Sequence, residues 1–392
     1  MKAKLLAAAL PLAVMAIASS CVSSEGENRP LSVLLAQSEM TRVPDPVNLD
    51  FQKTLKWDYS AATELLGMLR VAEMYDDDDL AAYVQQWADT MVLDNGDIVG
   101  YDQQKYNLDL ICPGKLLLKL YNRTENPKYL TAASHLMKQY ESQPRTAEGG
   151  MWHKKVYPHQ MWLDGLYMGA PFIAEYGQLT NADVAADVVR QFLIVGSHTY
   201  DDSTHLYRHA WDESRQMFWA DSVTGRSQHA WGRANGWYMM GMVDALEFIP
   251  EGTQGRDSLL TVLSGLAKTV LDYRDPKTGM WFQVLDSPKR EGNYVESTCS
   301  AMFIYAMLKA SRLGYIGNEY HDIAEEAFTQ YVHTFINNKG GLYSITTCCA
   351  VAGLGGKDMR DGTFDYYIRE PVRDNDPKAI GPFLMACCEL GL

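Results

Sequence analysis

Apolar residues recur at helical spacing along almost the whole chain, and this feature restricts the fold more than any other. Gly, Pro and Asn interrupt the pattern between the apolar segments. The long predicted helices are 58–75, 78–94, 108–122, 126–141, 159–177, 180–200, 229–248, 256–273, 295–313 and 318–337, and shorter ones lie at 31–41 and 379–391. We therefore expect an all-α protein.

The predicted helices come in pairs that repeat along the chain, which is typical of folds built from helical hairpins. Members that begin near 108, 159, 229 and 295 open with polar residues before they become apolar. Segments rich in Gly and aromatic residues follow several pairs, and we expect short strands or loops there: 149–153, 206–211, 279–282 and 340–343. Six hairpins can close into an (α/α)6 barrel with these strands and loops at one end. An open solenoid is the alternative, but different polar residues in each repeat suit a convergent site better than a flat binding face.

The start of the chain predicts export. Two lysines precede an apolar stretch over 5–18, which is the pattern of a signal peptide and too short for an ordinary membrane-spanning helix. Cys21 follows small residues at the expected cleavage point, as in bacterial lipoproteins, although Ala replaces the usual Leu three positions earlier. We expect a signal peptide at 1–20, lipidation of Cys21, a polar tether at 21–30 and one (α/α)6 domain at 31–392.

The remaining cysteines predict neither disulfides nor a metal site. They are Cys112, Cys299, Cys348, Cys349, Cys387 and Cys388. Vicinal cysteines bridge poorly, and the chain has no CxxC or Cys/His metal spacing. We expect free and mostly buried thiols. Nucleotide-binding and zinc-protease motifs are also lacking.

The charge of the chain restricts its partners. Lys and Arg number 35 against 49 Asp and Glu, so the net charge is −14. Such a surface binds nucleic acid poorly, and an acidic substrate would need positive groups gathered in one pocket. The 9 Trp and 23 Tyr suit sugar binding, although a large helical protein also uses aromatic residues in its core.

Two aspartates are the candidate acid–base groups. Asp164 lies in an aromatic, apolar run over 162–167, where loss of water favours a protonated carboxyl. Asp109 lies one hairpin earlier near the matching helix start, so a closed barrel would place both carboxylates across one mouth. Paired carboxylates suit glycoside chemistry. The alternatives are a structural Asp164 and an Asp109 that caps its helix.

A third cluster lies at 229–237. The guanidinium of Arg233 could bind a carboxylate through two parallel hydrogen bonds, and Trp231 and Trp237 could stack on a sugar ring. The alternative is a surface arginine beside two core tryptophans.

Together these segments resemble glycoside hydrolase family 105, the unsaturated rhamnogalacturonyl hydrolases, and more distantly the family 88 unsaturated glucuronyl hydrolases. The resemblance covers nearly the whole chain after the leader. Its blocks are YNLDLICPGKLL (106–117), MWHKKVYPHQMWLDGLYMGAPFIAEYG (151–177), HAWGRANGWY (229–238), CCAVAGLGG (348–356) and RDGTFDYYIREPVRDNDPKAIGPFL (360–384).

The resemblance implies an (α/α)6 barrel that removes a 4,5-unsaturated uronic acid from the non-reducing end of lyase-generated, pectin-type oligosaccharides. Asp164 would protonate C4, and water would add at C5 without a metal or cofactor. Asp109 would be the second acidic residue. The residues implied to bind the substrate are His209, Arg233, Trp231, Trp237, Lys154, Gln160, His153 and Tyr59.

Two other functions stay open: a family 88-like hydrolase acting on unsaturated glycosaminoglycan disaccharides, and a non-catalytic lipoprotein that captures oligosaccharides. With the leader, the resemblance predicts a Gram-negative periplasm or outer membrane, with membrane contact only through the lipid on Cys21.

Overall fold

The computed structural model describes residues 29–392. The signal peptide, Cys21 and almost all of the tether lie outside the described residues, so the expectations about them stay predictions.

Six helices form an inner ring. They are α3 (Tyr59–Tyr75), α5 (Gly114–Thr124), α7 (Leu163–Thr180), α9 (Gly232–Leu246), α11 (Ser297–Arg312) and α14 (Pro377–Leu390). Each contacts the next one along the chain, and α14 packs against α3, which closes the ring. Close packing at this junction needs glycine, since a Cβ on Gly67 would lie 2.6 Å from the Gly381 carbonyl oxygen.

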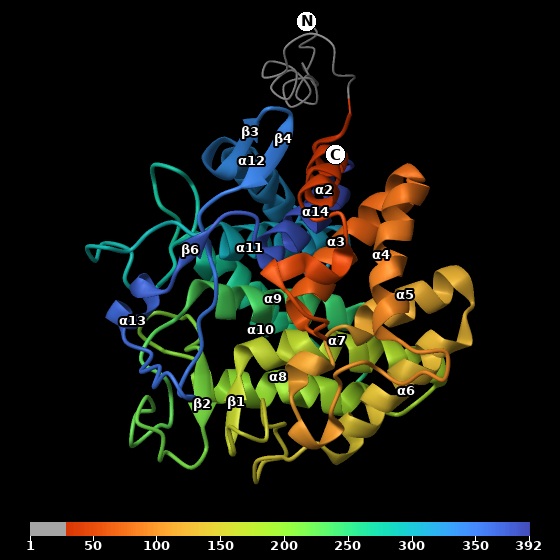
Figure 1. The fold of residues 1–392 in the computed structure, drawn as a ribbon. Coiled ribbons are helices and arrows are strands. Elements are labelled where there is room, and N and C mark those ends of the chain that lie inside the picture. The colour runs from red at the N-terminus through yellow and green to blue at the C-terminus, as the bar shows by residue number, and fades with distance from the viewer. Residues whose placement is uncertain (1–28) are drawn as a thin grey trace, which may run out of the picture.

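Six helices form the outer ring, and each pairs with an inner one. They are α4 (Asp78–Met91), α6 (Pro127–Ser142), α8 (Ala185–Thr199), α10 (Arg256–Leu271), α12 (Glu319–Phe335) and α2 (Leu31–Arg42). The sixth hairpin joins the two ends of the described residues, because α2 packs on α14 and the Ser32 hydroxyl donates to the Leu392 carbonyl at 2.5 Å. Figure 1 shows the C-terminus beside α2. The (α/α)6 prediction is therefore confirmed.

Burial differs between the two rings. Almost every residue of α7, α9 and α11 is buried, because these helices are covered by neighbours on all sides. The outer helix α4 buries one apolar face, which includes Leu80, Val84 and Trp87, and exposes the other. The outer helix α4 therefore carries apolar residues along one face only, whereas the inner helices α7, α9 and α11 are buried around their whole circumference.

The long connections each lead from an outer helix to the start of an inner one. They hold the paired strands β1 (Gln160–Trp162) with β2 (Ala210–Asp212), β3 (Ile336–Lys339) with β4 (Leu342–Ile345), and β5 (Cys348–Cys349) with β6 (Val372–Arg373). They also hold η1 (Pro46–Phe51), η2 (Gln103–Lys105), η3 (Leu108–Leu110) and α13 (Phe364–Arg369). In Figure 1, β1, β2, β6 and α13 gather on one side of the helices. Strands β2 and β4 thus begin within two of the four segments where short strands or loops were expected, 206–211 and 340–343.

Three predicted helices begin at least four residues too early, and one of them is 180–200, where α8 begins only at Ala185. The segment 108–122 starts as the single turn η3, and α5 begins only after Pro113, whose ring restricts the residue before it. The segment 159–177 starts as strand β1, because His159 has a φ of 64° and Gln160 pairs with Asp212. Tertiary pairing overrides the helical pattern at this point.

The six cysteines of the described chain are free, and all except the partly buried Cys388 are buried, as predicted. No helix within residues 29–392 has the length and apolar character needed to cross a membrane.

Candidate active site

Asp164 lies in the first turn of α7, immediately after β1. The pairing of β1 with β2 brings this turn against His209, whose carbonyl accepts a hydrogen bond from the Leu163 amide at 3.1 Å. Asp164 Oδ2 lies 3.0 Å from His209 Nε2. The aspartate side chain keeps 12% of its surface exposed, whereas the histidine side chain is fully buried. The carboxyl can therefore meet a ligand while its other side contacts a fixed imidazole.

The ring of His209 is fixed by one hydrogen-bonding partner and two aromatic neighbours. Its Nδ1 lies 2.7 Å from the hydroxyl of Tyr367 on α13, and Trp162 and Trp231 pack on the ring with centroids at 5.3 Å and 4.8 Å. Burial, and to a lesser extent nearby Tyr366, raises the pKa of Tyr367 well above its usual range, so this hydroxyl keeps its proton.

Asp109 lies in the short 3-10 turn η3 rather than in an α-helix. The Asn107 side chain caps this turn by accepting the Asp109 amide at 3.0 Å, so the Asp109 carboxylate is not the cap. Its Oδ2 lies 2.5 Å from Lys154 Nζ, and its Oδ1 lies 3.5 Å from His153 Nε2. Burial alone would raise the pKa of Asp109, but Lys154, with His153, lowers it below its usual range. Asp109 is therefore an ionised carboxylate.

His153 contacts Asp109 and lies beside Gly165, the residue after Asp164. Burial lowers its pKa to about 4, although Asp109 and Asp164 both act to raise it. Its ring stacks on Trp162 with centroids 4.7 Å apart. Gly165 makes room for it, since a Cβ there would lie 2.8 Å from His153 Nδ1. The neutral imidazole thus lies beside Asp109 and next to the turn that carries Asp164.

Gln160 and Tyr59 line the same region. Gln160 Oε1 accepts the Trp162 indole N–H at 3.0 Å, while its Nε2 has no partner among the described residues. Tyr59 is the first residue of α3. Burial is the main cause that raises the pKa of Tyr59. The charge of Asp109 raises it further and the charge of Arg233 lowers it, so the Tyr59 hydroxyl interacts electrostatically with both side chains.

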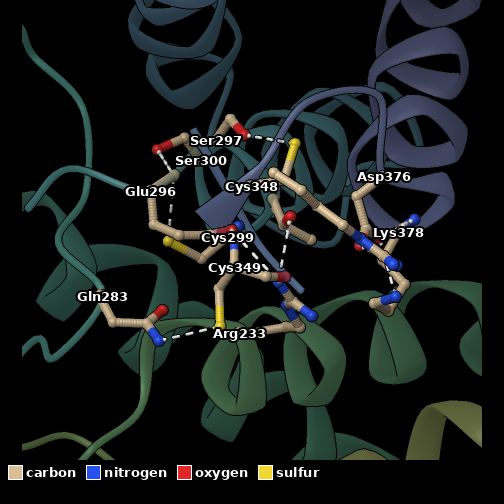
Figure 2. A network of polar contacts seen from close by, with 12 residues as sticks. Arg233, Gln283, Glu296, Ser297, Cys299, Ser300, Cys348, Cys349, Asp376 and Lys378 are labelled. Carbon is tan, nitrogen blue, oxygen red and sulfur yellow. Dashed lines mark hydrogen bonds and ion pairs between the residues drawn. The ribbon is translucent and has the colours of Figure 1, made fainter. Parts of the chain in front are cut away.

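Arg233 is buried in the first turn of α9 within a polar network (Figure 2). Its terminal nitrogen Nη2 donates to Glu296 Oε1 at 3.2 Å, to Thr298 Oγ1 at 3.3 Å and to the Cys349 carbonyl. Burial by itself lowers the pKa of Arg233, but Glu296 outweighs it and the pKa is raised. Arg233 therefore keeps its positive charge, and its Nη2 already donates hydrogen bonds to acceptors of the protein.

The two tryptophans of the third cluster are buried. Trp231 and Trp237 are each 1% exposed. Trp231 lies against His209 and donates to Gln283 Oε1 at 3.0 Å. Trp237 stacks on Tyr167 with centroids at 4.5 Å and meets Tyr59 edge-on. Neither indole presents an open face here, so their stacking on a sugar stays a prediction.

A surface cavity of about 760 Å³ lies beside α13, and neither aspartate lines it. It adjoins the site, since His229 on its wall accepts the His209 amide at 3.2 Å. Two of its arginines, Arg290 and Arg360, pair with acidic neighbours, so it is not the purely positive pocket that an acidic substrate would suggest.

Sequence reasoning missed two residues of this region. Tyr367 lies in the block at 360–384, but nothing local distinguishes it from the adjacent Tyr366. Glu296 is one of the polar residues at the start of an inner helix, and that position was its only signal.

Comparisons with known proteins agree with this fold. The family model described as Glycosyl Hydrolase Family 88 matches residues 31–391. A 24.9 kDa protein in the picA locus of Rhizobium radiobacter is 40% identical over 57% of this chain and 97% of its own length. The unsaturated rhamnogalacturonyl hydrolase YesR of Bacillus subtilis is 27% identical over 72% of this chain and 79% of its own. A solved family 105 glycoside hydrolase of C. acetobutylicum superimposes with a TM-score of 0.88, at 39% identity over 92% of this chain and 99% of that one.

Proposed function

The chain belongs to the glycosyl hydrolase families 88 and 105, the unsaturated uronyl hydrolases, and we propose that it acts on pectin-type fragments. It would remove a 4,5-unsaturated uronic acid from the non-reducing end of lyase-generated rhamnogalacturonan or related oligosaccharides. The named activity of the Bacillus subtilis relative supports this choice.

In the proposed mechanism the Asp164 carboxyl donates its proton to C4 of the unsaturated sugar. Positive charge then develops at C5 beside the ring oxygen, and water adds there. The carboxylate left on Asp164 regains a proton from that water. The hemiketal at C5 opens to a ketone and leaves C1 as an open-chain hemiacetal. This hemiacetal breaks down to an aldehyde and releases the next sugar with its hydroxyl, so one water is consumed. Proton donation by a positioned acid typically contributes about 10²–10⁴-fold.

One observation carries the proposal: Asp164 is partly exposed at the start of an inner helix and touches His209, while the neighbouring Asp109 is held ionised by Lys154. One carboxyl group is therefore accessible to a ligand, and the other stays charged. The fixed charge can orient the hydroxyls of the substrate through hydrogen bonds.

Turnover on a panel of unsaturated disaccharides, followed by loss of the ultraviolet absorbance of the double bond, tests the substrate. Activity on the rhamnogalacturonan-derived member is expected. Activity restricted to sulfated glycosaminoglycan disaccharides would instead support the family 88-like alternative.

Asp164→Asn tests the acid. Turnover should fall by about 100-fold or more, the usual scale of a lost general acid, while calorimetry still detects substrate binding. Asp183→Asn, on the exposed turn after α7, is the matched control and should behave as the wild type. Wild-type turnover in Asp164→Asn would remove the aspartate from this role.

We also propose that the protein is exported and anchored by a lipid on Cys21. The pattern of residues 1–21 supports this proposal. Cys21→Ser should abolish metabolic labelling with palmitate and release the protein from the membrane fraction of a Gram-negative host. Equal labelling of both forms would exclude the anchor.

A further inference from the structure

Tyr367 touches the acid only through His209. Its hydroxyl lies 2.7 Å from His209 Nδ1, and the opposite ring nitrogen, Nε2, lies 3.0 Å from Asp164 Oδ2. Tyr367 and His209 are fully buried. The three groups therefore form a chain from α13 through the ring of His209 to the carboxyl at the start of α7.

We infer that Tyr367 is a positioning residue that fixes His209 as the tautomer with its proton on Nε2. This inference rests on the proposed role of Asp164 as the proton donor. Within residues 29–392, the Tyr367 hydroxyl contacts no acceptor other than His209 Nδ1 at hydrogen-bond distance. A buried hydroxyl that donates to nothing is costly, so the phenol proton points to Nδ1 and leaves Nδ1 unprotonated. A neutral imidazole then carries its proton on Nε2, facing Asp164.

The tautomer decides where the proton of the acid can go. With a proton on Nε2, the imidazole is a donor toward Oδ2, so the acidic proton stays on the oxygen that faces the substrate. As that proton leaves, negative charge develops on the Asp164 carboxylate, and the N–H at His209 Nε2 is already placed to donate a hydrogen bond to it. With the opposite tautomer, the bare Nε2 would accept the acidic proton of Asp164 and hold it away from C4.

The resting geometry leaves this interaction incompletely formed. Although His209 Nε2 and Asp164 Oδ2 are 3.0 Å apart, neither atom makes an aligned hydrogen bond in the described part of the chain. A small rotation of the carboxyl would align the pair. Such tightening during the reaction is usual for catalytic hydrogen bonds.

Tyr367→Phe tests the inference, because it removes one oxygen and keeps the ring that packs on Trp231 and Tyr366. We expect kcat to fall by about 10- to 100-fold, the scale seen when an orienting partner is lost, and KM to change little, since Tyr367 is too buried to touch substrate. Tyr238→Phe is the matched control. It removes an equally buried hydroxyl, which donates to the Phe192 carbonyl at 2.8 Å, and should keep wild-type kcat.

Nitrogen-15 NMR of histidine-labelled protein reads the tautomer directly, with His209→Gln to assign the signals. Wild-type and Tyr238→Phe proteins should show a protonated Nε2 and an unprotonated Nδ1 at His209, and Tyr367→Phe should show a mixture. A wild-type His209 protonated on Nδ1, or unchanged kcat in Tyr367→Phe, would overturn the inference. A wild-type protein inactive on every unsaturated uronide would refute the proposed function, while the spectrum would still decide the tautomer.

Discussion

Within residues 29–392, Glu296 is the one carboxylate that forms an ion pair with Arg233, and its replacement gives the sharpest test of the buried network. Its Oε1 accepts from Arg233 at 3.2 Å and from the Cys349 amide at 2.8 Å, and its Oε2 caps α11 through the Cys299 amide at 2.7 Å. Glu296→Gln keeps the size of the side chain. However, it removes the charge and turns an NH₂ group toward at least one of these N–H donors.

The expected cost follows from these contacts. Breaking a buried ion pair on one side typically costs about 3–5 kcal/mol, because the remaining charge is left without compensation. The three contacts share one carboxylate, so they are not added separately. Part of the helix cap survives through the remaining oxygen. We therefore expect the free energy of unfolding to fall by about 3–5 kcal/mol.

Urea unfolding of Glu296→Gln, Arg233→Met and the double variant measures this effect. The double variant leaves no unpaired charge, so its cost should be smaller than the sum of the single costs by about 1–3 kcal/mol. Glu251→Gln, in the exposed turn after α9, is the control and should stay within about 0.5 kcal/mol of the wild type. A loss below about 1 kcal/mol for Glu296→Gln, or strictly additive costs, would refute the reasoning.

Two further predictions concern pH. Burial lowers the pKa of His153 from 6.5 to about 4 in the folded protein, so the unfolded chain binds its proton first as pH falls. Stability should therefore decline by about 3 kcal/mol between pH 6.5 and 4, and His153→Gln should flatten this part of a urea-midpoint profile; parallel profiles would contradict it. Lys154 lowers the pKa of Asp109 in the folded protein. The ionised Asp109 therefore stabilises the fold at any pH above the pKa that it has in the unfolded chain. This stabilisation is lost as the pH falls through the lower pKa of the folded protein. Lys154→Met should move that loss to higher pH, and an unchanged carbon-13 titration of the Asp109 carboxyl would exclude the proposed pairing.

The site illustrates how far local sequence reasoning reaches. Asp164 stood out because a carboxylate in an aromatic run is unusual, and the structure places it in the first turn of an inner helix as the repeat suggested. Arg233 was expected to be open to a uronate, yet one nitrogen is committed to Glu296, which lies 63 positions later. Nothing near Arg233 in the sequence indicates that partner.

The sequence by itself determined the helices and their repeated pairing into hairpins. These follow from the spacing of apolar residues within each helix, because burial of one face is a local and periodic requirement. Closure of the hairpins into a ring was favoured over an open solenoid by the sequence and is decided by the packing of α14 against α3. Only the tertiary structure decided which polar atoms meet. Tyr367 reaches His209 across 158 positions, and β1 replaces a predicted helical turn because it pairs with β2. Hydrogen bonds between connections have no period along the chain, so they appear only when the closed ring brings the connections together.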